Sequence, residues 1–150
     1  MRKAFTMIEL IFVIVILGIL AAVAVPKLAA TRSDAEVSAK AHMIMTGATE
    51  IASFAVAKGY TEDDLSSMSN SITTLVDSGD AVLDVDNSKA TVIVGSASEC
   101  ITIKITKNVS DDILSVLFGD TNGDAKCISL QSLINAADYP IKLRGQSIVY

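Results

Sequence analysis

The most prominent pattern in the sequence is an unbroken apolar block near its beginning. Residues 10–25 read LIFVIVILGILAAVAV and contain no charged side chain. With the five residues before it, this block forms a stretch of 21 residues, 5–25. A helix of that length measures roughly 30 Å, which matches the hydrocarbon core of a bilayer. We therefore predict a membrane-spanning helix over residues 5–25.

A second helical pattern follows Pro26. Apolar residues recur there at alternating steps of four and three: Val37, Ala41, Ile44, Ala48, Ile51 and Ala55. This spacing places one narrow apolar stripe along a helix, which can then pack against a domain. Pro26 lacks an N–H and clashes with the preceding turn, so it should kink or locally melt the helix. Gly59 is suited to end it after Lys58, which predicts an amphipathic half over residues 26–59.

Residues 60–150 carry shorter patterns that predict a small globular head. Residues 90–94 are rich in β-branched side chains, and residues 100–106 alternate strictly between apolar and polar. This alternation predicts an antiparallel hairpin with a turn over residues 95–99. We expect the apolar side of the hairpin to cover the stripe of the long helix.

Other segments of the head give weaker signals. Residues 81–85 and 146–150 are further strand candidates, whereas residues 113–118 fit either a helix or a strand. The acids at residues 62–64 predict a short helix just after them, and Asp111-Asp112 predicts another helix start. The patterns together predict an α+β fold, in which a long N-terminal helix packs on a small antiparallel β-sheet head.

The charge balance and the residue inventory exclude several classes of function. The chain has 12 Lys and Arg against 17 Asp and Glu, a net charge of −5. This balance disfavours direct nucleic-acid binding, which needs a basic footprint. The single histidine, His42, lies on the predicted long helix, and no Ser/His/Asp set, Cys/His set or phosphate-binding glycine loop occurs. We therefore expect no enzyme.

The two cysteines, Cys100 and Cys127, are 27 positions apart. They do not form a CxxC motif, and a zinc site would need more Cys or His ligands than His42 can add. A disulfide formed in an oxidising compartment is the favoured interpretation, and it places residues 27–150 outside the cytoplasm. Two buried free thiols are the alternative.

Asp120, Asn122 and Asp124 place oxygen ligands at alternate positions, like the beginning of a calcium loop. An EF-hand also needs Gly at its sixth position and Glu at its twelfth, where this chain has Ala125 and Gln131. A polar turn is therefore the favoured interpretation. A single calcium ion with ligands drawn from elsewhere is the alternative, and we expect no other cofactor.

Glu9 is an acidic residue at the beginning of the apolar block. A carboxylate in hydrocarbon costs several kcal/mol, and such residues usually have a partner and a function. If the chain began at Phe5, the new α-amino group would lie one helical turn from Glu9, in the same chain or in an adjacent one. The alternative is that Glu9 merely favours the positive N-terminus of the helix.

The N-terminal region resembles the class III signal of type IV pilins and type II secretion pseudopilins. The resemblance covers the basic leader up to Ala4, the run Phe5-Thr6-Met7-Ile8-Glu9-Leu10 and the apolar stretch after it. It implies that a prepilin peptidase cleaves between Ala4 and Phe5 and N-methylates Phe5, and that Glu9 guides assembly. Pro26 matches the helix-kinking proline of that family, whereas Ala4 stands where Gly is usual.

The resemblance also implies an organisation and a set of partners. We expect a leader peptide over residues 1–4, a transmembrane and filament-core helix over 5–25, its amphipathic continuation over 26–59 and a pilin-like periplasmic head over 60–150. The expected function is that of a structural subunit of a type IV pilus or a type II secretion-like pseudopilus. The expected partners are further copies, related minor pilins and an inner-membrane assembly platform with a cytoplasmic ATPase. The subunit would begin in the bacterial inner membrane and end in a filament, in the periplasm or at the cell surface.

Two other classes of protein share parts of this pattern. Ala22-Val23-Ala24 fits the small-residue cleavage site of an ordinary signal peptide, which would release a secreted binding domain. Glu9 argues against that interpretation because the apolar part of such a signal is normally free of acids. A permanently membrane-anchored periplasmic domain is the other alternative.

Overall fold

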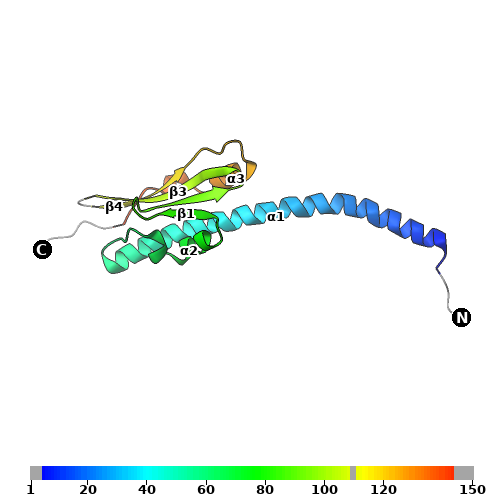
Figure 1. Cartoon of the computed structure of the whole chain (residues 1–150), viewed down its shortest axis with the longest axis horizontal. Coiled ribbons are helices and arrows are strands. Elements are labelled where there is room, and N and C mark those ends of the chain that lie inside the picture. The colour runs from blue at the N-terminus through cyan, green and yellow to red at the C-terminus, as the bar shows by residue number, and fades with distance from the viewer. Residues whose placement is uncertain (1–4, 109–110, 144–150) are drawn as a thin grey trace. The chain divides into compact units, whose positions relative to one another are not determined.

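The computed structural model describes residues 5–108 and 111–143 of the chain (Figure 1). Its elements, in chain order, are α1 (Met7–Lys58), η1 (Leu65–Ser67), α2 (Asn70–Asp77), β1 (Ala81–Asp84), β2 (Lys89–Val94), β3 (Ala97–Lys107), β4 (Asp112–Phe118), α3 (Ala125–Leu133), η2 (Ala136–Asp138) and β5 (Ile141–Lys142). The chain divides into two compact units, residues 1–36 and residues 37–150. The α+β fold predicted from the sequence is confirmed.

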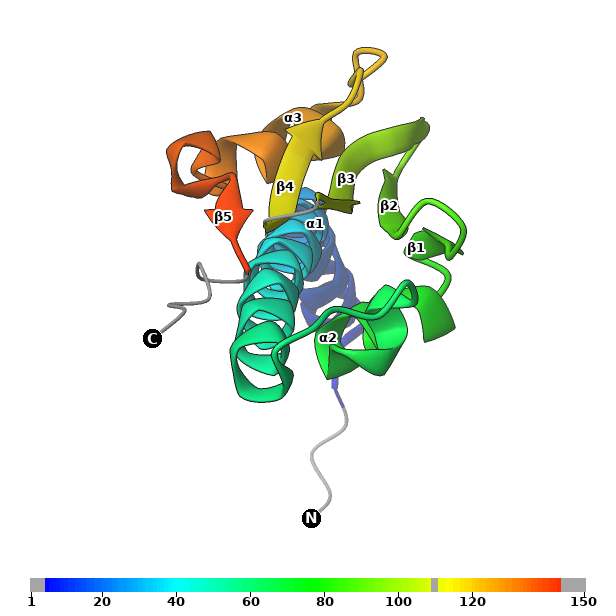
Figure 2. The same cartoon turned by 90° about the vertical axis from the view of Figure 1, so that its left-hand side faces the viewer.

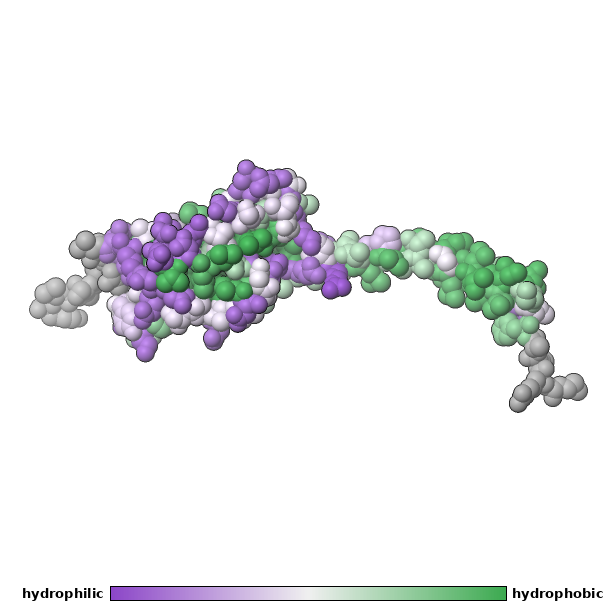
Figure 3. All heavy atoms as spheres, in the orientation of Figure 1, coloured by the Kyte–Doolittle hydropathy of each residue, from purple (hydrophilic) through white to green (hydrophobic). Residues whose placement is uncertain are grey.

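The first unit contains the apolar half of α1. The helix begins at Met7, two residues later than predicted, and its helical assignment continues through Pro26 without a break. A bend at Pro26 stays a prediction. Every residue from 5 to 32 is exposed, and the space-filling view shows a nearly continuous hydrophobic surface over this segment (Figure 3). An 18-residue stretch of α1 has a mean hydropathy of 3.1, so the helix is long and apolar enough to cross a membrane.

The second unit is built around the rear half of α1. The apolar stripe is buried as predicted, at Val37, Ala41, Ile44, Ala48, Ile51 and Ala55. Figure 2 shows the sheet lying over one side of this helix and α2 lying beside it. Gly59 follows the last helical residue with a φ of 78°, a left-handed conformation that glycine adopts without strain. The stripe and the inner face of the sheet form one core.

The sheet has five antiparallel strands in the order β1-β2-β3-β4-β5. The predicted hairpin is confirmed as β2 and β3, with Ala90 opposite Ile103. Its turn is shorter than expected, because β3 already begins at Ala97. Residues 81–84 form strand β1 as expected, whereas the strand candidate at residues 146–150 lies outside the described residues.

Two local predictions in the head were undecided or wrong. The ambiguous segment at residues 113–118 is a strand, because it pairs along its whole length with β3. Asp112 begins that strand, so the predicted helix start at Asp111-Asp112 is wrong. The short helix after residues 62–64 is confirmed as η1, and the Asp64 carboxylate caps it by accepting from the Ser66 amide.

Candidate processing and assembly segment

Thr6 and Glu9 close a reciprocal capping box at the first turn of α1. The Thr6 amide donates a hydrogen bond to Glu9 Oε2 at 2.9 Å, and the Thr6 hydroxyl donates to the same oxygen at 2.6 Å. The Glu9 amide in turn donates to Thr6 Oγ1 at 3.4 Å. Thr6 is thus the N-cap of the helix and Glu9 its third residue. The carboxylate proposed to act in assembly is held in place by its own chain.

Glu9 was singled out from the sequence alone, whereas the capping role of Thr6 was not predicted. A Thr followed three residues later by Glu, just before an apolar run, is the usual signature of a capping box. The signal was therefore present in the spacing of the two residues. The capping box is important next to an apolar block, because a backbone amide that enters hydrocarbon must find its hydrogen-bond partner within the protein.

The residues that follow the predicted cleavage site are not covered by other described parts of the chain. Phe5 is 79% exposed, and the apolar side chains that follow it are also exposed, at 78% for Met7 and 76% for Ile8. Ala4, the other residue of the predicted cleavage site, lies outside the described residues. Nothing within the described chain covers this apolar surface, so lipid or other chains must do so.

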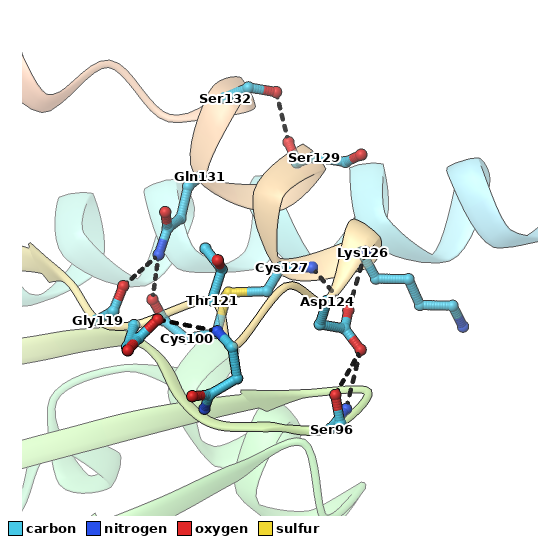
Figure 4. Close-up of a disulfide and its surroundings, with 12 residues drawn as sticks. Ser96, Cys100, Gly119, Thr121, Asp124, Lys126, Cys127, Ser129, Gln131 and Ser132 are labelled. Carbon is cyan, nitrogen blue, oxygen red and sulfur yellow. Dashed lines mark hydrogen bonds between the residues drawn. A yellow bond between two sulfur atoms is a disulfide. The ribbon is translucent and has the colours of Figure 1, made fainter.

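A disulfide joins Cys100 at the beginning of β3 to Cys127 in α3, and both residues are fully buried (Figure 4). The expected disulfide is therefore present, and Cys127 lies on helix α3, Ala125–Leu133, which the sequence patterns did not predict. Gln131, one turn further along α3, donates to the carbonyls of Cys100 and Gly119, both at 2.9 Å. The helix is therefore attached to the ends of the two central strands by one covalent and two polar contacts.

The calcium candidates in the loop before α3 already have hydrogen-bond partners. Asp124 caps α3 by accepting from the amides of Lys126 and Cys127, and it also accepts from the Ser96 amide at 3.0 Å. The bond from the Ser96 amide, followed by that from Cys127, holds the pKa of Asp124 below its usual range. Asp120 accepts from the Asn122 amide within the loop. Calcium binding at this loop stays a prediction.

The described part of the chain offers no ready-made cluster of metal ligands. Residues 5–108 and 111–143 contain no group of three or more His, Cys, Asp and Glu side chains that could hold a metal ion. His42 is exposed on α1.

Comparison with known proteins identifies the N-terminal segment. A family model described as the prokaryotic N-terminal methylation motif matches residues 1–25. No curated protein and no solved structure matches the chain. The matched residues include the capping box, Phe5 and most of the exposed apolar helix. The chain carries at its N-terminus the methylation motif that is the hallmark of the type IV pilin and pseudopilin family.

Proposed function

We propose that the chain is the precursor of a structural filament subunit, a type IV pilin or a type II secretion-like pseudopilin, and not an enzyme. The observation that carries the proposal is the methylation motif at residues 1–25, together with the exposed apolar side chains of the front part of α1, none of which is buried up to residue 25. Such a surface needs lipid before assembly and the helices of other subunits afterwards. A filament whose core is a bundle of these helices meets both needs.

Processing would convert the precursor into a subunit that can assemble. A prepilin peptidase would cleave between Ala4 and Phe5 and methylate the new amine of Phe5. Cleavage also removes Arg2 and Lys3, which leaves 10 basic against 17 acidic side chains and a side-chain charge of −7. The mature subunit would then carry an amine and the Glu9 carboxylate one helical turn apart, in a segment where charges are costly.

The capping box supports a particular role for Glu9. Both hydrogen bonds that Thr6 donates to this carboxylate end on Oε2, so the other oxygen, Oε1, takes no part in the capping box. In a bundle, Oε1 could accept from the Phe5 amine of an adjacent copy. That contact would neutralise both charges and would fix the axial offset between neighbouring subunits.

The proposed location follows from the membrane segment and the disulfide. The subunit would cross the inner membrane once, with its head in the periplasm, where a structural disulfide can persist. An inner-membrane platform driven by a cytoplasmic ATPase would then lift it into a filament of further copies and related minor pilins. Such a filament could be a pilus, a secretion pseudopilus or a competence filament, and these three systems have to be distinguished by experiment.

The first experiment determines the N-terminal residue and the intact mass of the membrane-extracted protein. We expect a chain that begins at Phe5 and carries one added methyl group. A chain that begins after Ala24 would instead identify a secreted domain, and an uncut chain would identify a simple anchor. Either result contradicts the proposal.

A Glu9→Ala variant tests the assembly step separately from processing. We expect it to be cleaved and methylated but to stay in the inner membrane, while Glu99→Ala assembles normally. Glu99 is a suitable control because it is an exposed acid on the head. Unchanged filament yield from Glu9→Ala would contradict the assembly role.

A further inference from the structure

The sheet has an outer face that the core does not use. Along β3 the residues Ile101, Ile103 and Ile105 point into the core and are buried. Side chains alternate across a strand, so the residues between them lie on the opposite face. This outer face carries the half-buried Lys89, Thr102, Lys104 and Ser115, the buried Thr91 and the exposed Leu117.

Two lysines lie directly opposite each other on the outer face. Lys89 on β2 is the register partner of Lys104 on β3, so both side chains start from the same part of the outer face, where both residues are half-buried. Like charges in directly opposite positions destabilise a sheet. The ion pairs between described residues include neither lysine. The fold therefore tolerates a repulsion at this point.

The neighbours of the pair offset its charge only in part. Asp84 on β1 is the register partner of Lys89 and places one carboxylate beside the pair; its two oxygens accept from the amide and the side chain of Asn87, at 3.3 and 2.7 Å. On the other side, the register partner of Lys104 is Ser115, which is uncharged. The row of Asp84, Lys89, Lys104 and Ser115 thus has one net positive charge, on a chain whose processed form carries −7.

We propose that Lys89 and Lys104 form a docking face for the acidic head surface of a neighbouring copy. The proposal rests on the proposed function, because a filament brings identical heads into contact. Heads that each carry excess negative charge repel one another unless a positive patch on one meets carboxylates of the next. The outer face supplies such a patch, and its lysines, which form no ion pair with another described residue, gain carboxylate partners on assembly.

The proposal predicts opposite effects on stability and on assembly. Lys104→Gln removes the repulsion, so the full-length protein in detergent should unfold at a higher temperature. The same variant should lower filament yield about tenfold, the effect of losing one well-formed charged contact. Lys104→Arg keeps the charge and should keep the yield. Lys58→Gln, at the exposed end of α1, is the matched control for loss of one positive charge and should assemble normally.

A zero-length cross-link identifies what covers the lysines. Filaments assembled from a mixture of isotope-labelled and unlabelled copies are treated with a carbodiimide, which joins an amine to a carboxylate in contact. We expect mixed-isotope peptides that link Lys89 or Lys104 to an Asp or Glu of another copy. Links only within one copy, links to a different macromolecule, or normal yield from Lys104→Gln would each overturn the proposal. Wild-type protein that is processed but never forms filaments would contradict the proposed function itself, and this inference with it.

Discussion

The Glu50 carboxylate on α1 accepts a 2.6 Å hydrogen bond from the hydroxyl of Ser69, the N-cap residue of α2. The same oxygen, Oε2, also accepts from the Ser71 amide at 3.0 Å. Glu50 therefore places a negative charge at the positive end of a short helix, where it is favourable. The bonds from Ser69 and Ser71 lower the pKa of Glu50 below its ordinary value.

Glu50→Gln should destabilise the head at neutral pH by about 1 kcal/mol, because the charged acceptor at the N-terminus of α2 is lost. The folded-state pKa is lowered, so the contribution is complete above the ordinary value of about 4.5 and disappears as the pH falls through the folded pKa. Thermal unfolding of the full-length protein in detergent, followed at pH 7 and at lower pH, measures both effects.

The control for this prediction is Glu99→Gln, which makes the same chemical change at an exposed position on β3. We expect its melting temperature to match that of the wild type at each pH. A Glu50→Gln deficit that stayed constant down to pH 3 would contradict the electrostatic explanation.

Thr61 and Asp112 tie the loop after α1 to the beginning of β4. The Thr61 hydroxyl donates to Asp112 Oδ2 at 2.6 Å, and the Asp112 side chain is almost fully buried, with 2% of the residue exposed. Thr61→Val keeps the shape but removes this donor, so we expect a loss of about 1.5–3 kcal/mol in the free energy of unfolding. Thr61→Ser should lose much less because it keeps the hydroxyl. Chemical denaturation of the wild type and the two variants measures these stabilities. Equal stabilities for Thr61→Val and Thr61→Ser would contradict a contribution from the Thr61 hydroxyl.

The disulfide should contribute more to the stability of the head than any single hydrogen bond described above. It closes a loop of 27 residues, which is worth about 3.5 kcal/mol in the chain-entropy model. We therefore expect the double variant Cys100→Ala, Cys127→Ala to unfold at a markedly lower denaturant concentration. Adding a reductant should shift the denaturation midpoint of the wild type toward that of the variant and leave the midpoint of the variant unchanged. A wild type that stays unaffected after complete reduction would show that the buried contacts of α3 suffice.

The sequence predicts those parts of the fold whose signals are local and periodic. The stripe from Val37 to Ala55 and the alternation around Ile103 each repeat a single spacing several times, so the rear half of α1 and the hairpin are predicted correctly. Residues 113–118 form too short an apolar run to distinguish a helix from a strand, and pairing with β3 decides the outcome.

The missed helices depend on partners far away in the sequence. Helix α2 has eight residues, and its N-terminus is completed by Glu50 from α1. Helix α3 has nine residues and is attached to β3 through Cys100. Helices this short are marginal by themselves, so tertiary contacts determine them. The capping box at the candidate site depends only on two residues three positions apart. It could therefore have been predicted directly from the sequence.

Thr6→Ala should loosen the first turn of α1 without affecting the rest of the helix. The variant loses the hydroxyl that accepts from the Glu9 amide and donates to the Glu9 carboxylate. Loss of an N-cap costs about 1 kcal/mol, which corresponds to roughly fivefold faster hydrogen exchange at the Glu9 amide. Thr6→Ser keeps the hydroxyl and should exchange like the wild type, and the amide of Leu17, deep within α1, should be unchanged in both variants. Exchange measured by NMR on the full-length chain in micelles tests this, and equal Glu9 rates in the Ala and Ser variants would show that the Thr6 hydroxyl does not hold the helix start.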